Sequence, residues 1–184
     1  MRQSFDKTSR SDSFKFEVLS LSSSCAGFDC SIPEYNDYLN NDALRSQNDH
    51  IALTWLLVEK STSKVVSYMS LIMDAIKLTG AEKELHNLNY PFRTIPAMKI
   101  AKLAVDHSFS VKYRGIGTFM IANAEFLALL CNSEYCAARF LTVDADVEHD
   151  KGVLVFYEKN GFLLNAELYN KNRKIISMRK DIYR

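Results

Sequence analysis

The stretch Leu103–Gly117, LAVDHSFSVKYRGIG, decides how this chain can fold. It begins with the apolar residues of a strand, continues as a loop and ends where a helix begins. Gly115 and Gly117 lack a Cβ, so the backbone there can bend tightly and approach a bound anion closely. The helix that follows turns its unpaired N–H groups toward the same spot, and Lys112 and Arg114 add positive charge. The stretch therefore predicts a strand–loop–helix unit that binds a multi-phosphate ligand.

Three kinds of glycine-rich loop could account for this pattern. The mononucleotide loop needs G-x-x-x-x-G-K-[ST], which is absent, and the dinucleotide loop needs a third glycine, which is missing here. A K/R/Q-x-x-G-x-G loop is met by Lys112–Gly117, KYRGIG. Taken alone, this match is also compatible with a simple glycine-bearing turn.

A second motif, FYEKNGF over residues 156–162, lies about forty residues further along the chain. Tyr157 within it is open to two interpretations. A tyrosine is commonly a packed residue with its hydroxyl at the surface. Its phenol can also donate a proton to a leaving group, and the loop upstream favours this second interpretation.

The composition is that of a globular protein of one domain. The chain has 184 residues, of which 47% are hydrophobic and 24% charged, with a formal net charge of +1. Residues 1–13 are polar and are expected to be a flexible lead, and residues 14–184 a single domain. The near-neutral charge gives no general attraction to nucleic acid. No secretory signal and no apolar run of roughly 20 residues is evident, which predicts a cytoplasmic protein without a membrane segment.

The four cysteines form two C-x4-C pairs, Cys25 with Cys30 and Cys131 with Cys136. Structural zinc sites use tighter spacing, and no histidine lies near enough in the sequence to complete one. We therefore expect reduced cysteines and no metal.

The chain alternates strand and helix patterns typical of an α/β or α+β sandwich. A helix is expected from Pro33, with Ser31 as its N-cap, and a second short helix is expected to be capped by Asp150 and to end at Gly161. Between them, a long helix is expected over residues 118–130. Strands are expected over residues 14–21, 52–59, 65–73, 97–106, 138–144, 162–168 and 174–180. A polar turn is expected to join 52–59 and 65–73, which are rich in β-branched and aromatic residues, into an antiparallel hairpin, and residues 74–96 are expected to be a long connection.

The order LAVD, KYRGIG, FYEKNGF resembles the Gcn5-related N-acetyltransferase superfamily, over roughly residues 14–182. The resemblance implies an α/β (α+β) fold: a seven-stranded mixed, mainly antiparallel sheet with helices on both faces and splayed central strands. It also implies acetyl-CoA as co-substrate and an amine as acceptor.

The same resemblance implies roles for particular residues. The pantetheine arm would lie along Leu103, Ala104 and Val105, where a backbone N–H would polarise the thioester carbonyl. Tyr157 would be the general acid that protonates the departing thiolate of CoA. The pyrophosphate would lie on amides of Lys112, Tyr113, Arg114, Gly115, Ile116, Gly117 and Thr118. The general base stays open: Asp106, His107, Asp144, Glu148 and His149 lie close to the expected cleft in sequence, and the resemblance also allows a water chain or no base at all.

A narrower resemblance is to the toxin branch of this superfamily. It is carried by Phe28-Asp29-Cys30, by Tyr38-Leu39 with Ala43, and by Ile95-Pro96 before IAKLAVD over 100–106. It implies acetylation of the α-amine of aminoacyl-tRNA and a ribbon-helix-helix antitoxin as partner. Ser31 stands where the branch usually has glycine, and Lys102 where it has arginine. A basic patch for tRNA could comprise Arg93, Lys99, Lys102, Lys112 and Arg114.

Three functions therefore follow from the sequence. A general amine N-acetyltransferase comes first, a tRNA-acetylating toxin second and a non-catalytic acyl-CoA-binding module third. Edge strands such as the last one could also pair two chains into a homodimer.

Overall fold

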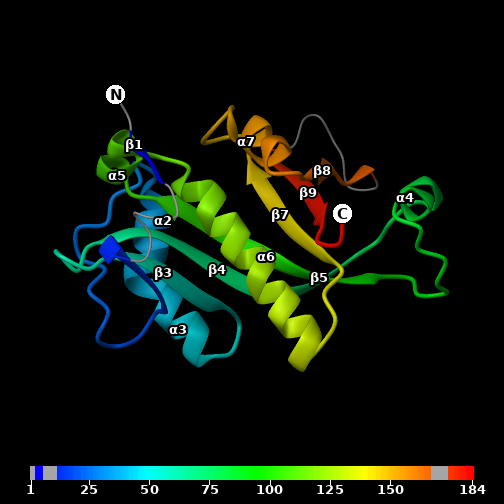
Figure 1. Ribbon diagram of the computed structural model, residues 1–184, viewed down its shortest axis with the longest axis horizontal. Helices are drawn as coiled ribbons and strands as arrows, with labels where there is room; N and C mark the ends of the chain where they lie inside the picture. The colour runs from blue at the N-terminus through cyan, green and yellow to red at the C-terminus, as the bar shows by residue number, and fades with distance from the viewer. Residues whose placement is uncertain (1–2, 6–11, 167–173) are drawn as a thin grey trace. The chain divides into compact units, whose positions relative to one another are not determined.

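The computed structural model describes residues 3–5, 12–166 and 174–184, and Figure 1 shows the path of the chain. Within these residues, seven strands form one sheet. Their order is β2 (Phe14–Val18), β3 (Leu53–Glu59), β4 (Val65–Ile76), β5 (Ile95–Val105), β7 (Phe140–Asp146), β9 (Ile175–Asp181) and β8 (Leu163–Leu164). A separate two-stranded sheet pairs β1 (Gln3–Ser4) with β6 (Tyr113–Arg114). The chain divides into two compact units. The first unit is Met1–Ile72 with Ala101–Asn123, and the second is Met73–Ile100 with Ala124–Arg184. The expected seven-stranded mixed sheet is confirmed.

Antiparallel strands form the sheet of the first unit. β2 (Phe14–Val18) pairs with β3 (Leu53–Glu59), which pairs with β4 (Val65–Ile76), as expected for a hairpin around a polar turn. Phe16 of β2 stacks on Trp55 of β3 with ring centroids 4.8 Å apart. The alternation of side chains places these rings on one face, while Leu56 and Tyr68 face the other way.

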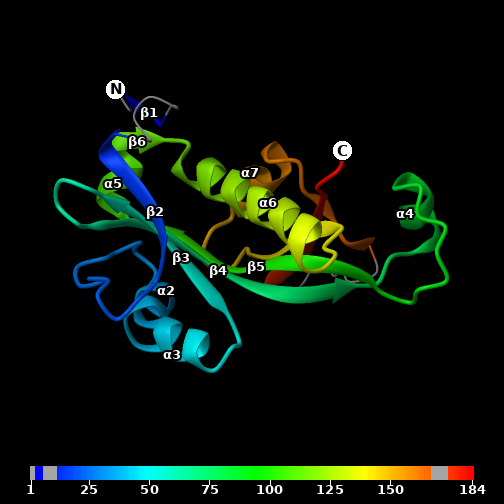
Figure 2. The ribbon, with the colours of Figure 1, turned by 60° about the horizontal axis from the view of Figure 1, so that its bottom comes forward.

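Helices cover both faces of this sheet, and Figure 2 shows α2 and α3 on one of them. α2 (Pro33–Asp37), the π-helix η1 (Tyr38–Asp42) and α3 (Ala43–Asn48) follow one another directly. Leu39 and Ala43 pack with Leu56 and Tyr68 in one buried cluster. On the opposite face, the ring of Phe119 contacts that of Phe16, at 6.4 Å between centroids.

The expected N-cap of α2 is wrong. Ile32, not Ser31, precedes Pro33 as the N-cap, and no side chain caps this helix. Ser31 instead adopts a left-handed backbone with φ of 69°. Its N–H donates to Oδ1 of Asp29 at 2.8 Å, so the aspartate builds the turn that leads into the helix.

The loop expected after β5 (Ile95–Val105) is largely helical. α5 (His107–Lys112) follows the strand at once, and β6 (Tyr113–Arg114) follows α5. Asp106 starts this helix, because its carboxylate accepts from the Ser108 backbone N–H at 2.9 Å. The strand–loop–helix unit is therefore a strand, a short helix, a two-residue strand and then α6 (Ile116–Glu134).

Parallel and antiparallel pairs form the sheet of the second unit. Ala97–Ile100 of β5 pairs in parallel with Phe140–Val143 of β7 (Phe140–Asp146). β9 (Ile175–Asp181) runs antiparallel to β7, and β8 (Leu163–Leu164) runs antiparallel to β9. The connection expected between β4 and β5 contains α4 (Gly80–Leu85), which begins with a capping box of Thr79 and Glu82.

α7 (Val153–Lys159) is the short helix expected before Gly161. Gly161 has a φ of 86°, which confirms its expected left-handed C′ position. Asp150 does not cap the helix: Gly152 is the N-cap, and the Asp150 carboxylate accepts from its N–H at 2.7 Å. The last residues of the strand expected over 162–168 lie outside the described residues.

Within the described residues, α6 is the one helix with the length and apolar composition to cross a membrane. Core helices of soluble proteins have the same length and composition. Ile116, Met120, Ala124 and Ala128 recur every four residues along it and are all buried. This stripe is typical of a helix that packs against a sheet.

Candidate active site

Gly115 bends the chain where α6 begins. Its φ is 90°, a conformation that side chains with a Cβ rarely adopt, and a Cβ placed there would meet no atom within 4 Å. Its carbonyl accepts from the Phe119 N–H at 2.9 Å, so it closes the first turn of the helix. The N–H groups of Ile116, Gly117 and Thr118 precede any helical acceptor and point out of the helix end. The bend therefore presents a set of amides suited to an anion.

Residues near the start of the chain hold this loop in place. Gln3 and Ser4 of β1 pair in parallel with Tyr113 and Arg114 of β6. The Phe5 N–H donates to the Arg114 carbonyl at 2.9 Å. The Phe5 ring is buried and packs on the rings of Phe14, Tyr113 and Phe119. The N-terminal segment, expected to be a flexible lead, thus contains three residues, Gln3, Ser4 and Phe5, that pair with or pack on this loop.

Two basic side chains flank the bend. Lys112 Nζ lies 5.0 Å from the centre of the Tyr113 ring, and the Tyr113 hydroxyl beside it raises the pKa of Lys112. Arg114 is exposed. Both side chains therefore bring a cationic group to the bend.

The end of β5 lies in the same unit as the bend. Leu103 and Val105 are half-buried, and Ala104 is buried. The Ala104 carbonyl accepts from Ser67 Oγ at 2.6 Å. This strand end is therefore fixed by its neighbour on β4.

Lys102, just before it on β5, lies against two aromatic rings. Its Nζ is 4.5 Å from the centre of Tyr35 and 5.5 Å from that of Tyr38. The Tyr68 hydroxyl donates to the Tyr35 carbonyl at 2.8 Å, and the rings of Tyr38 and Tyr68 stack. The lysine charge is thus held over an aromatic platform.

Tyr157 belongs to the second unit and is buried on α7. Its ring packs edge-on against Phe156 and Phe162, at 5.1 and 5.3 Å between centroids. The Tyr157 carbonyl accepts from the N–H groups of Asn160 and Phe162, which closes the end of the helix. The motif FYEKNGF therefore fixes the tyrosine ring in one orientation.

The two candidate bases of the first unit, Asp106 and His107, differ in burial and in the hydrogen bonds they make. The Asp106 carboxylate is buried and accepts from the Asp29 and Ser108 N–H groups and from Ser108 Oγ. These three donors give Asp106 a structural role. His107 is exposed on α5, and its backbone N–H donates to the Asp29 carbonyl.

All three candidate bases of the second unit have ionic partners. Asp144 accepts from Lys99 Nζ at 2.6 Å and Glu148 from Lys174 Nζ at 2.5 Å. His149 Nδ1 lies 2.7 Å from Asp146 Oδ2. Burial would raise the pKa of Asp146, but the hydrogen bonds and charge of His149 lower it.

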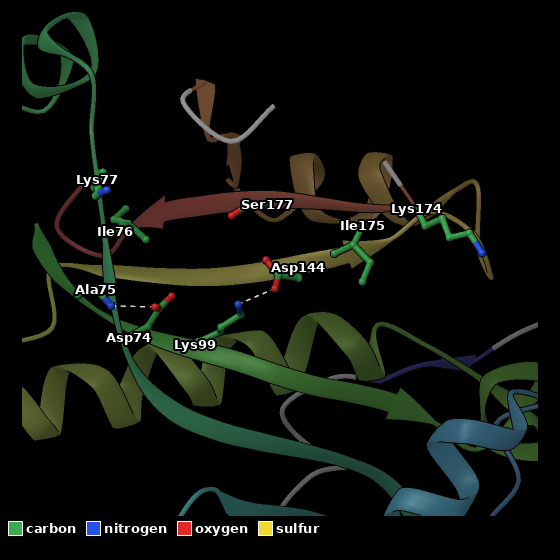
Figure 3. Close-up of a pocket in the computed structure, with 9 residues that line it drawn as sticks. All are labelled: Asp74, Ala75, Ile76, Lys77, Lys99, Asp144, Lys174, Ile175 and Ser177. Carbon is green, nitrogen blue, oxygen red and sulfur yellow. Dashed lines mark hydrogen bonds and ion pairs between the residues drawn. The ribbon is translucent and has the colours of Figure 1, made fainter. Parts of the chain in front are cut away.

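A cavity of about 600 Å³ lies in the second unit, and Figure 3 shows its lining. Asp74 reaches it from β4, Lys99 from β5, Asp144 from β7 and Ser177 from β9. The Asp74 carboxylate accepts from Thr142 Oγ1 at 2.6 Å, which links β4 to β7. The sequence motifs did not identify Asp74 or Ser177 as candidate site residues. The cavity is lined by Asp74, Ala75, Ile76, Lys77, Lys99, Asp144, Lys174, Ile175 and Ser177.

Solved structures share this arrangement of strands and helices. AtaT complexed with acetyl-methionyl-tRNAfMet matches with a TM-score of 0.74 at 19% identity, over 92% of this chain and 95% of that one. AtaTR bound with AcCoA matches with a TM-score of 0.70 at 20% identity, over 91% and 94%. The chain has the fold of the Gcn5-related N-acetyltransferases. The expected fold is thereby confirmed.

A KacT variant with a tyrosine replaced by phenylalanine also has this fold, with a TM-score of 0.72 at 20% identity, over 91% of this chain and 95% of that one. No family model matches the sequence. AtaT is a toxin that has been solved with its antitoxin AtaR, so the likeness to AtaT supports the expected resemblance to the toxin branch at the level of the fold.

Proposed function

We propose that the protein is an N-acetyltransferase that moves the acetyl group of acetyl-CoA to a primary amine. The observation that carries the proposal is the left-handed bend at Gly115 that opens α6, in a fold shared with a protein solved with AcCoA. Such a bend exposes amides to a pyrophosphate. Lys112 and Arg114 supply the countercharge.

The chemistry needs few groups from the chain. A backbone N–H among Leu103, Ala104 and Val105 polarises the thioester carbonyl. The neutral amine attacks the carbonyl carbon, the C–S bond breaks, and the thiolate takes a proton from Tyr157. KacT and AtaT are both solved as variants with a tyrosine replaced by phenylalanine, and the same replacement at Tyr157 tests its role in this chain. The pyrophosphate lies on the amides of Ile116, Gly117 and Thr118 at the bend. The Tyr113 amide, also expected to hold it, already donates to the Phe109 carbonyl.

The cavity of the second unit is our candidate for the acceptor. Its Asp74 and Asp144 carboxylates suit a cationic amine, and Asp144 is 41% exposed beside its partner Lys99. A carboxylate there attracts the ammonium form and accepts its proton, directly or through water. Lys77 and Lys174 give the same cavity a place for an acidic group near that amine.

A second candidate function is a toxin that acetylates the α-amine of aminoacyl-tRNA and is inhibited by an antitoxin. It is favoured by the AtaT structures with acetyl-methionyl-tRNAfMet and with the antitoxin AtaR. Ser31 has the left-handed backbone that would explain a glycine in this branch. Lys102 retains a cation where the branch has arginine. We expect a cytoplasmic enzyme in either case, and a homodimer is a further proposal.

The test is release of CoA thiol from acetyl-CoA with amines, peptides and aminoacyl-tRNAs as acceptors. We expect one acceptor class to be turned over, and Tyr157→Phe to bind acetyl-CoA like wild type but acetylate more slowly. Asp144→Asn should raise the KM for the amine and leave acetyl-CoA binding unchanged. Equal rates for wild type and Tyr157→Phe would remove the tyrosine from the mechanism. Acetyl-CoA binding without turnover of any acceptor would support a binding module instead.

A further inference from the structure

Two thiols lie side by side at the C-terminal end of α6, and the proposed function uses neither. Cys131 Sγ and Cys136 Sγ are 3.3 Å apart. Cys131 is half-buried in the last turn of the helix, and Cys136 is exposed just beyond it. At this separation a small rotation of the side chains brings the sulfurs to bonding distance.

The backbone explains why residues five apart meet. Both the Tyr135 and the Cys136 N–H groups donate to the Cys131 carbonyl at 2.9 Å. The chain therefore wraps back over the end of the helix instead of continuing its spiral. This wrap carries Cys136 onto the side of the helix where Cys131 points.

Asn132 fixes the turn from its other side. Its Oδ1 accepts from the Ala138 N–H, and its Nδ2 donates to the Ala138 carbonyl at 2.9 Å. The same Nδ2 donates to the Tyr183 hydroxyl at 2.8 Å. The segment between the two cysteines is thus short, and the hydrogen bonds of the Asn132 side chain hold it in place. Little chain entropy remains to be lost when the sulfurs join.

We propose that Cys131 and Cys136 form a reversible oxidation site that closes into an intramolecular disulfide on exposure to hydrogen peroxide. The exposed Cys136 sulfur, as thiolate, attacks a peroxide oxygen and becomes a sulfenic acid while one water is released. Cys131 sulfur then attacks Cys136 sulfur and expels a second water. Two thiols lose two electrons and two protons in total, and the peroxide is reduced to water. A dithiol restores the reduced pair by exchange.

The other two cysteines provide an internal comparison. The Cys30 thiol donates to Asn36 Oδ1 at 3.1 Å and to the Ile32 carbonyl at 3.7 Å, so it is engaged with other partners. Cys25 is half-buried, whereas Cys136 is exposed to a peroxide in solution. The pKa of both thiols is raised, that of Cys25 by burial and that of Cys136 by its hydrogen bond with Cys131, so exposure is what separates them. A peroxide should therefore modify the pair at the end of α6 before it modifies the pair near the start of the chain.

Trypsin separates the two pairs, since Gly115–Arg139 and Phe16–Arg45 each contain no internal lysine or arginine. The folded full chain is reduced, treated with hydrogen peroxide, alkylated and digested. We expect the peptide 115–139 to lose two hydrogens and escape alkylation, and to regain both labels after dithiothreitol. The peptide 16–45 should stay fully alkylated under the same treatment.

A second probe tests proximity without oxidation. Phenylarsine oxide bridges two neighbouring thiols, so it should block alkylation of the peptide 115–139 in wild type but leave Cys131 alkylated in Cys136→Ser. Equal oxidation of both peptides, disulfides between chains or sulfonic acid on an unbridged Cys136 would each overturn the proposal. None of these readouts depends on acetyl transfer.

Discussion

Arg179 of β9 donates from Nη1 to the Glu82 carboxylate of α4 at 2.6 Å, with both side chains almost fully buried, at 2% and 9% exposure. The same nitrogen donates to the Leu164 carbonyl and to Asn165 Oδ1. Arg179 Nε donates to His86 Nε2 at 3.3 Å, and His86 Nδ1 lies 2.9 Å from Asp181 Oδ2. This buried network ties the short helix α4 to the sheet of the second unit.

Breaking the buried ion pair should strongly destabilise the protein. Glu82→Ala leaves the Arg179 charge buried without its carboxylate partner, and we expect a loss of about 3–5 kcal/mol in the free energy of unfolding. Glu148→Ala is the matched control, because Glu148 and Lys174 form a solvent-exposed ion pair whose loss should change the free energy of unfolding very little. Urea unfolding measures both. Equal effects of the two variants would contradict a structural role for the network.

Acid should weaken the same network in two stages. Burial lowers the pKa of His86 from its ordinary 6.5, so the unfolded chain binds a proton that the folded chain does not. Stability therefore falls as the pH drops below about 6.5 toward the folded pKa. Glu82 and Asp181 add a second loss below their ordinary values of 4.5 and 3.8. For both, burial opposes the shift, but backbone N–H donors and the neighbouring charges lower the pKa.

The first loss of stability depends on the His86 imidazole, so replacing His86 tests it. The urea midpoint of wild type should begin to fall near pH 6.5, whereas that of His86→Gln should hold until the carboxylates titrate. Identical pH profiles would assign the first loss to another group.

Patterns that repeat along the chain predicted the fold well. The β-branched and aromatic residues of 52–59 and 65–73, on either side of a polar turn, predicted the hairpin of β3 and β4, because such residues suit buried strands, and Val65–Leu71 are all buried. Gly161 marked the end of α7, since few other residues adopt its backbone conformation. These signals depend only on residues close together in the chain, so a single sequence is enough to detect them.

Features that depend on contacts between residues far apart in the sequence were not predicted. β1 is held by backbone hydrogen bonds to β6, which require no particular side chains. Asp74 and Thr142 meet across the sheet although 68 residues separate them. α5 has only six residues, too few for a helical repeat of apolar residues to stand out.

Gly115→Ala should impair acetyl-CoA binding if the proposed function is correct. Alanine disfavours the left-handed backbone by about 1–2 kcal/mol, so the bend relaxes and its amides turn away from the pyrophosphate. A loss of 1.4 kcal/mol in binding corresponds to a Kd about tenfold weaker, measurable by calorimetry. Gly27→Ala is the control: Gly27 has a φ of 84°, and a Cβ there also meets no atom within 4 Å. It should lose similar stability and keep the wild-type Kd, and an unchanged Kd for Gly115→Ala would contradict the phosphate site.

Ser31→Gly should stabilise the protein. Ser31 has a φ of 69° and is exposed, so its side chain adds the cost of a left-handed backbone without packing in return. Glycine removes about 1–2 kcal/mol of that strain and loses about 0.5–1 kcal/mol through the entropy of the unfolded chain, which leaves a net gain. The Ser31 N–H bond that lowers the pKa of Asp29 is kept, because it comes from the backbone. Ser31→Ala retains the strain and should not gain stability in urea, so a gain shared by both variants would show that the hydroxyl, and not the backbone, is unfavourable there.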